Sequence, residues 1–256
     1  MKTLAQTATV SFRWDGARVF GPARAPVYGQ GQFDFRSGRG SLVIDLPELR
    51  HQEPGTEHAL LLPAQVFLQP KATATAVLPR GKPWLLATIS GSESVKRNFP
   101  QFVGQVEGVN PVFLVDELSW GATAAQSLGG RRISGVPLHE YRVSVDLARA
   151  LSGATGPAAP ASSLAIQEQL TAVGSGQSSS TSPTVPILVW IDRAGRVVQL
   201  QASLPGAGEG TAVVTVRSFG DAVRIAAPPP TQVIDITSLS PSGERENNGG
   251  GDSDGA

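Results

Sequence analysis

The chain contains no cysteine among its 256 residues, so disulfide bonds, thiolate zinc sites and cysteine nucleophiles are excluded. Acidic and basic residues are equal in number, and the formal net charge is therefore zero. No run of basic residues is longer than two, as in Arg131-Arg132. A surface without a basic tract argues against nucleic acid as a partner.

Long apolar runs are also missing. No stretch reaches the roughly 18 apolar residues that indicate a membrane-spanning helix. The first residues, Met1 to Thr7, are too polar for the apolar core of a signal peptide. We therefore expect either a cytosolic protein or the mature portion of an exported one.

Familiar catalytic motifs are absent from the sequence. It has no Gly-x-Ser-x-Gly elbow, no His-Glu-x-x-His pair and no phosphate-binding Gly-x-x-x-x-Gly-Lys loop. Gly29-Gln30-Gly31 falls inside a predicted strand, where glycines indicate a close backbone approach. The best remaining candidate for acid–base chemistry is His139 beside Glu140. We expect no enzyme activity, no catalytic residue and no cofactor.

A metal site is the other possibility that the histidines raise. His51 and His58 flank Glu53 and Glu57, but Pro54-Gly55 between them indicates a loop without fixed ligand spacing. We interpret this stretch as a solvated polar loop and predict no metal.

What the chain has in abundance is alternation of apolar and polar residues, which is typical of antiparallel strands with one buried face. The clearest hairpin joins 28–35 to 41–46 through a glycine-bearing turn. A second joins 184–191 to 196–204 through Asp192-Arg193-Ala194-Gly195. Further strands are predicted over 7–14, 59–69 with a break at Pro63, 72–78, 82–89, 135–145 and 211–218, with an extended piece over 222–226.

Three short helices are predicted. Asn110 and Pro111 provide an N-cap and a first-turn proline for an amphipathic helix that continues to Leu118. Asp146 is a natural N-cap for a second helix, and 162–172 forms a third on a flexible arm rich in Gly, Ser and Pro. Residues 241–256 contain almost nothing apolar and are predicted to be disordered.

The alternate apolar positions of the strands predict one buried face. This face is either a packed core or the wall of a partly filled cavity, because three short helices leave a wide sheet partly uncovered. In the cavity interpretation the helix over 111–118 is a lid with Phe113, Leu114 and Leu118 pointing inward. The candidate walls are Phe12, Phe33, Phe35, Leu42, Ile44, Tyr141, Val143, Val145, Ile187, Val189, Val214 and Val216.

Six segments follow one another in an order shared with a known family. They are a first hairpin (Gly31 to Leu42), Gly81-Lys82-Pro83-Trp84, a capped helix (Asn110 to Leu114), a strand similar to "G-V-x-T-x-H-Y" (Gly135 to Tyr141), a hairpin similar to "P-V-x-V-W-I-D-x-x-G-R" (Pro186 to Arg196), and Phe219-Gly220 with Ile225 to Pro229. Over about residues 4–236 the chain resembles the LppX/LprG-type lipoproteins of actinobacteria, whose fold is similar to that of the lipoprotein carrier LolA.

The resemblance implies a mainly β (α+β) fold, in which a curved antiparallel sheet forms a half-open β-barrel with a few short covering helices. It implies a LolA-like lipid-binding domain over 4–236 with a flexible insert at about 152–183, and a disordered tail over 237–256. The expected function is a non-enzymatic carrier that holds acyl chains in a hydrophobic cavity. The alternative is an envelope sensor or regulatory protein that binds another protein through its sheet surface.

Partners and location are expected from the same resemblance. The partner is a lipid or acylated molecule in the cavity, with no nucleic acid, and the protein is a monomer. An extracytoplasmic, membrane-associated location is implied, although the signal peptide and the lipidated cysteine of the family are absent from this chain. Contact with a membrane surface would then occur through a lipid anchor that this chain does not include.

Overall fold

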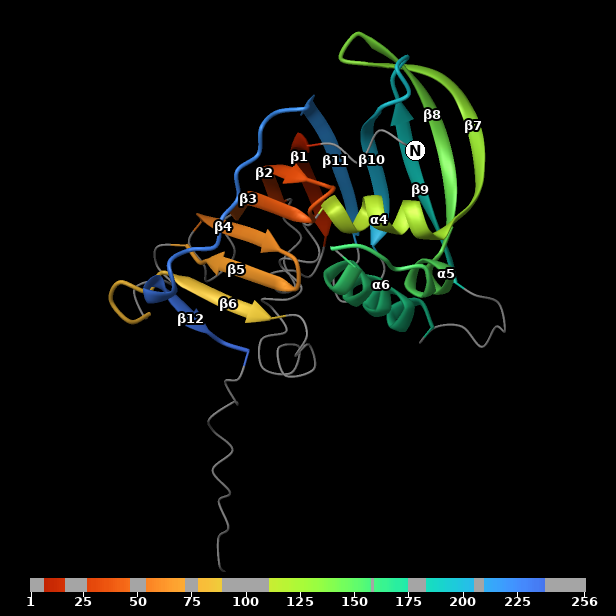
Figure 1. Ribbon diagram of the computed structural model, residues 1–256. Coiled ribbons are helices and arrows are strands. Elements are labelled where there is room, and N and C mark those ends of the chain that lie inside the picture. Colours follow the sequence, from red (N-terminus) through yellow and green to blue (C-terminus); the bar gives the residue numbers. More distant parts are fainter. Residues whose placement is uncertain are drawn as a thin grey trace, which may run out of the picture.

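Twelve β-strands form one sheet in the computed structural model, which describes residues 7–16, 27–46, 54–71, 78–88, 111–157, 159–174, 183–204 and 210–237. The sheet order is β12-β6-β5-β4-β3-β2-β1-β11-β10-β9-β8-β7 (Figure 1). The strands are β1 (Thr7–Gly16), β2 (Val27–Asp34), β3 (Arg39–Leu46), β4 (Gly55–Leu62), β5 (Gln65–Gln69), β6 (Trp84–Thr88), β7 (Ala122–Ile133), β8 (Val136–Asp146), β9 (Thr184–Ile191), β10 (Val197–Leu204), β11 (Gly210–Phe219) and β12 (Val233–Asp235).

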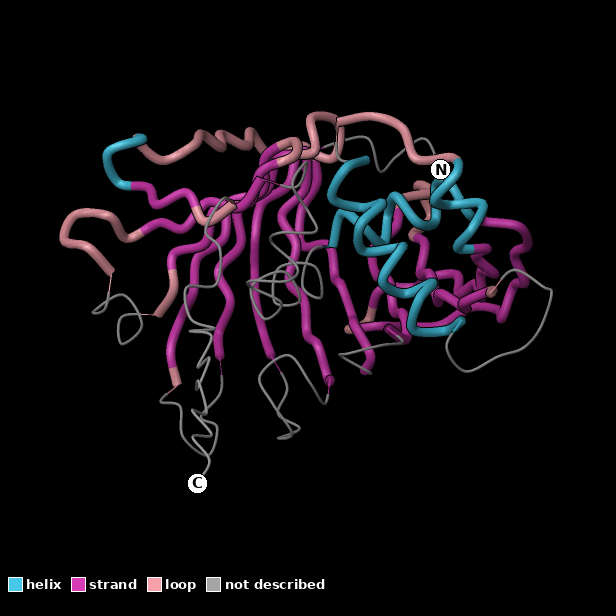
Figure 2. The backbone as a smooth tube through the Cα atoms, turned by 90° about the horizontal axis from the view of Figure 1, so that it is seen from below, coloured by secondary structure: helices cyan, strands magenta, loops and turns pink. Residues whose placement is uncertain are grey.

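The sheet is curved and half-open, as predicted. Figure 2 shows the strands bending into an arch, with the helices gathered on one half. Every neighbouring pair of strands is antiparallel except β12 and β6, which are parallel. Most pairs join strands that are close in sequence, whereas β1 pairs with β11 and so connects the two halves of the sheet.

Short-range turn chemistry explains the hairpins. In the β9–β10 turn, Asp192 Oδ1 accepts hydrogen bonds from the backbone N–H groups of Ala194 and Arg196, both at 2.9 Å. Gly195 adopts a φ of 76°, which the left-handed region allows for glycine at no steric cost. The predicted break at Pro63 is the turn between β4 and β5.

Alternation along the strands gives the sheet two distinct faces. The inner face carries the buried apolar side chains, among them Ile44 of β3, Ile187 of β9 and Val214 of β11, and the outer face carries exposed residues such as Asp45 and Arg142. The buried residues of the inner face and those of the helices form one continuous hydrophobic cluster. The core therefore lies between the sheet and its covering layer.

Three helices form part of that covering layer: α4 (Pro111–Gly121), α5 (Leu147–Ser152) and α6 (Ala159–Gly174). Helix α4 contacts β7, β8, α5 and α6. The predicted cap at Asp146 is confirmed, because its Oδ1 accepts from the Arg149 N–H at 2.9 Å. Helix α6 is longer than the predicted helix over 162–172, and it packs on α4 and α5 through the buried Leu164 and Ile166.

Two strands at the sheet edges do not follow from the sequence pattern. Strand β7 consists of Ala, Thr, Gln, Ser, Gly and Arg without apolar alternation, and Thr123 to Arg132 are exposed on both faces. Strand β12 has three residues and follows a single 3-10 turn, η2 (Pro230–Gln232). Ile236 N–H donates to the Leu86 carbonyl at 2.9 Å, which extends the β12–β6 contact.

Several expectations fall outside the described residues, among them the strand over 72–77 and the disordered tail over 241–256. His51 and Glu53 also lie outside them. Within the described part of the chain, no helix is both long enough and apolar enough to cross a membrane.

Candidate ligand site beneath helix α4

The wall of the candidate site is built from cross-strand rows on the inner face. One row joins Val143, Ile187, Ala202 and Ala212 across β8, β9, β10 and β11, and its neighbour joins Tyr141, Val189, Leu200 and Val214. Seven of these eight residues are buried, and Tyr141 is half-buried. The inner face of this half of the sheet is therefore an uninterrupted apolar surface four strands wide.

The predicted wall residues on the other half belong to the same cluster. Phe33, Leu42 and Ile44 are buried, and so are Val145 of β8 and Val216 of β11. Phe35 is half-buried in the turn after β2 rather than on the strand, and its ring stacks on Phe33 with centroids 5.9 Å apart. Phe12 takes the register position between Val214 and Gly29, and its side chain lies outside the described part.

Helix α4 places its apolar side chains on this surface. Phe113, Leu114 and Leu118 are no more than 3% exposed and belong to the same cluster as Val143 and Ile187. Spacings of one, four and five residues put these three side chains on one side of the helix. The structure thus brings the predicted lid residues and the predicted wall together, with α4 covering the wall.

The C-terminal end of α4 is anchored tightly. A Cβ atom added to Gly121 would lie 2.7 Å from the Asp146 carbonyl oxygen and 2.8 Å from both Val145 Cγ1 and Ala150 Cβ. The helix also continues directly into β7 at Ala122. This end is therefore fixed to the β8–α5 junction, and any movement of α4 would pivot there.

The middle of α4 carries two carboxylates that sequence reasoning missed, the half-buried Asp116 and the buried Glu117. Ser162 Oγ donates a hydrogen bond to Asp116 Oδ2 at 2.6 Å, and Gln169 Nε2 donates to Glu117 Oε2 at 3.3 Å. Ser162 and Gln169 are seven residues apart, two turns of α6, so both donors lie on the same side of that helix. Among the described residues, α4 and α6 therefore form two hydrogen bonds with each other, and both join a neutral donor on α6 to a carboxylate on α4.

Burial controls the protonation of both groups. It raises the pKa of Asp116 to about 6 against the smaller opposing effect of the Ser162 hydrogen bond. It likewise raises the pKa of Glu117 to about 7 against the effect of the Gln169 hydrogen bond. Among the described residues, no charged side chain contributes to either shift, so ionisation near neutral pH places two negative charges between α4 and α6 with no described cation beside them.

Two of the three histidines, His58 and His139, lie in the described part of the chain, on different strands. His139 is exposed on β8, and its neighbour Glu140 forms an ion pair with Arg131 on β7 at 3.6 Å. The stretch predicted as a solvated loop around Pro54-Gly55 is in fact the start of β4, which turns His58 outward and buries Glu57. No group of three potential metal ligands occurs among the residues that the structure describes.

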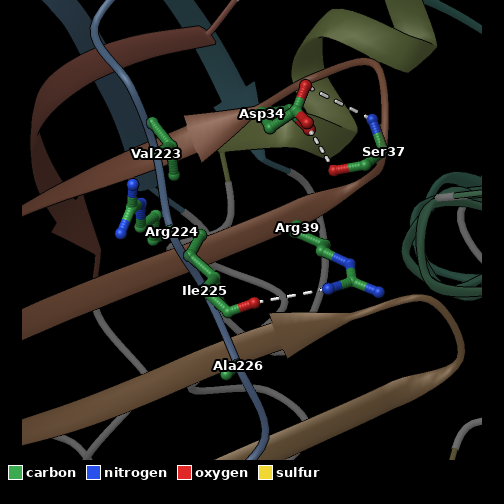
Figure 3. A pocket seen from close by; sticks show the side chains of 7 residues that line it. All are labelled: Asp34, Ser37, Arg39, Val223, Arg224, Ile225 and Ala226. Atoms are coloured by element: carbon green, nitrogen blue, oxygen red, sulfur yellow. Dashed lines mark hydrogen bonds between the residues drawn. The ribbon is translucent and has the colours of Figure 1, made fainter.

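A separate cleft lies on the outer face and was not expected from the sequence. It has a volume of about 450 Å³ and lies between the β2–β3 turn and the segment that leads from β11 to η2 (Figure 3). The Arg39 guanidinium donates to the Ile225 carbonyl at 3.3 Å. This hydrogen bond holds the segment that leads from β11 to η2 against the sheet, on the face opposite the candidate site. The cleft is lined by Asp34, Ser37, Arg39 and Val223 to Ala226.

Comparison with known proteins gives matches only at the level of structure. No protein-family model matches the chain. No curated protein matches it either. LprF from Mycobacterium bovis is similar with 12% identity and a TM-score of 0.43, covering 88% of this chain and 90% of that one. LppX from Mycobacterium tuberculosis gives 14% identity and a TM-score of 0.38, with 87% and 90% covered. A chain of the Pseudomonas aeruginosa MucA/MucB complex gives 12% identity and a TM-score of 0.30, with 89% and 55% covered.

Proposed function

We propose that the protein is a non-enzymatic binding protein that holds an acyl chain against the inner face of its sheet, with α4 as a movable cover. The observation that carries this proposal is the continuous apolar surface formed by β8 to β11, whose buried residues share one cluster with the apolar side chains of α4. An acyl chain needs only such a surface, at about 25 cal/mol per Å² buried, and no reacting group. A place in the cell envelope, implied by the sequence resemblance, belongs to the same proposal.

In the conformation described, α4 occupies the space that the ligand would take. Leu114 and Leu118 are 1% exposed, so the wall becomes accessible only when α4 moves away from it. The movement pivots at Gly121 and separates Asp116 from Ser162 and Glu117 from Gln169. The acyl chain then replaces the contacts that the side chains of α4 lose.

A reversible crosslink tests this mechanism, because the native chain has no cysteine of its own. The double variant Asp116→Cys with Ser162→Cys places two thiols where the side chains already touch, 2.6 Å apart at their oxygens. We expect the oxidised form to lose uptake of monopalmitoylglycerol, a neutral lipid with one acyl chain. A reducing agent should restore the uptake, measured by native mass spectrometry.

The matched control is Asp45→Cys with Thr56→Cys, which joins β3 to β4 where the two side-chain oxygens lie 3.3 Å apart. Asp45 and Thr56 are both exposed. Oxidation of this pair should leave uptake unchanged. If the α4–α6 crosslink forms and uptake continues at the same level, α4 is not a movable cover. If the reduced protein takes up no lipid at all, the carrier proposal is wrong and the protein-binding alternative gains support.

A further inference from the structure

One cross-strand row on the inner face ends on a carboxylate. The row begins under α4 at Tyr141 and passes through Val189, Leu200 and Val214. From Val214 it continues through the register positions of Phe12, Gly29 and Ile44 to Glu57 on β4. Every position before the last is occupied by an apolar residue, glycine or tyrosine. Glu57 is thus the first ionisable carboxylate that a molecule lying along the row would meet.

Glu57 is buried and incompletely satisfied. It is 6% exposed, and its neighbours on the inner face of β4 and β3 are the buried Ala59 and Ile44. Its Oε2 atom has no hydrogen-bond partner among the residues that the structure describes. A buried polar atom without a partner costs the free energy of its lost hydration, so native structures rarely contain one without a reason.

The surroundings of Glu57 satisfy only part of its hydrogen-bonding capacity. Burial is the largest effect and raises its pKa, while the backbone N–H and the charge of Lys71 oppose that rise. Lys71 lies close to the start of β4, because a Cβ added to Gly55 would lie 2.9 Å from Lys71 Cβ. Lys71 therefore binds one side of the carboxylate, and Oε2 stays available on the inner face.

We propose that Glu57 receives the head group of the bound lipid, and that this head group is a hydrogen-bond donor such as a hydroxyl or an amine. The inference rests on the proposed function and names its ligand class. An ionised carboxylate only accepts hydrogen bonds, so a donor satisfies Oε2, whereas an anionic head group would be repelled by it. The acyl chain extends from Glu57 along the row toward α4.

The dimensions of the sheet fit a single long acyl chain. Neighbouring strands are about 4.8 Å apart, so the four steps from β4 to β11 span about 19 Å along the row. That distance is comparable to the length of an extended long-chain acyl group. In Figure 1 the N-terminal part of α4 reaches toward β11, which places the end of the chain at the cover.

Two ligands with the same acyl chain separate the head-group contribution from the chain contribution. Monopalmitoylglycerol carries two hydroxyl donors, whereas methyl palmitate carries none. We expect the wild-type protein to bind monopalmitoylglycerol about tenfold more tightly, as for a hydrogen bond to a charged group. In Glu57→Leu, which removes the carboxylate but keeps an apolar side chain of similar volume, the two ligands should bind equally.

The matched control is Glu140→Gln, which alters a half-buried carboxylate on the outer face of the same sheet and should keep the preference. Thermal unfolding of Glu57→Leu checks that the variant is folded. If the wild type binds both ligands equally, or if Glu57→Leu keeps the preference, the head-group inference is wrong while the carrier proposal stands. If the wild type binds neither ligand, both are wrong.

Discussion

The carboxylates in the hairpin turns and those between helices α4 and α6 have opposite surroundings. Asp192 in the β9–β10 turn accepts two backbone N–H hydrogen bonds and pairs with the Arg196 side chain, with Nη2 at 2.7 Å and Nε at 2.8 Å. Partial burial acts to raise the pKa of Asp192, but these hydrogen bonds and the Arg196 charge together hold it below its usual value. Glu117 has one neutral donor and no cation among its described neighbours, and burial raises its pKa to about 7.

The difference separates carboxylates that stabilise a turn from carboxylates that weaken their surroundings when they ionise. Turn carboxylates such as Asp192 and Asp34 are ionised at all physiological pH values, and their hydrogen bonds hold a tight turn closed. The α4 carboxylates weaken their own interface once they ionise, because no cation in the described part of the chain compensates their charge.

Removing the charge from α4 should produce the larger effect. For a carboxyl group whose pKa is higher in the folded than in the unfolded state, stability is greatest below the unfolded pKa, and it is lost as the pH rises through the folded pKa. The unfolding free energy of the wild type should therefore fall between about pH 4.5 and pH 7. Glu117→Gln should be more stable than the wild type at about pH 8, by on the order of 3 kcal/mol.

Urea unfolding at a series of pH values measures this difference. The two proteins should have similar stability near pH 4, where the wild-type side chain is protonated in both states. If the wild type and Glu117→Gln are equally stable near pH 8, the ionised Glu117 side chain is either exposed or paired with a cation. The contrast with the turn carboxylates would then disappear.

Removing the charge from the turn should have a smaller effect of opposite sign. Asp192→Asn loses the ion pair with Arg196 and should destabilise the fold by about 1 kcal/mol at neutral pH. The pKa of Asp192 is lowered by folding, so its stabilising contribution is present above the unfolded pKa and disappears as the pH falls through the folded value. The same urea series should show the variant and the wild type converging in strong acid, and a constant difference across the whole range would contradict this account.

The parts of the fold that depend on local chemistry were predictable from the sequence. Asp146 caps α5, and the Asp192-Arg193-Ala194-Gly195 turn joins β9 to β10, because in both cases the chain supplies its own hydrogen bonds within four residues. The alternation of Val143, Ile187 and Val189 identified the buried face, because side chains on a strand follow a period of two. The structure also places α4 on that face, as its apolar spacing predicted.

Features that depend on distant partners could not be predicted in the same way. Strand β7 has no apolar alternation because both its faces are exposed, and only its pairing with β8 makes it a strand. Glu57 was grouped with His58 because they are adjacent in sequence, yet on β4 they point to opposite faces. Asp116 and Glu117 look like ordinary acidic residues of an amphipathic helix, and their surroundings depend on Ser162 and Gln169 of α6, which are 46 and 52 residues away.

The most direct test of the central claim is to locate the bound acyl chain. Monopalmitoylglycerol with a photoactivatable diazirine in its chain can be crosslinked to the wild-type protein, and the labelled residues can be identified by peptide mass spectrometry. We expect labels on the inner-face residues between Glu57 and α4, such as Ile44 and Val214, and on the apolar side of α4. Labels confined to the outer face, for example at the cleft beside Arg39, would contradict it.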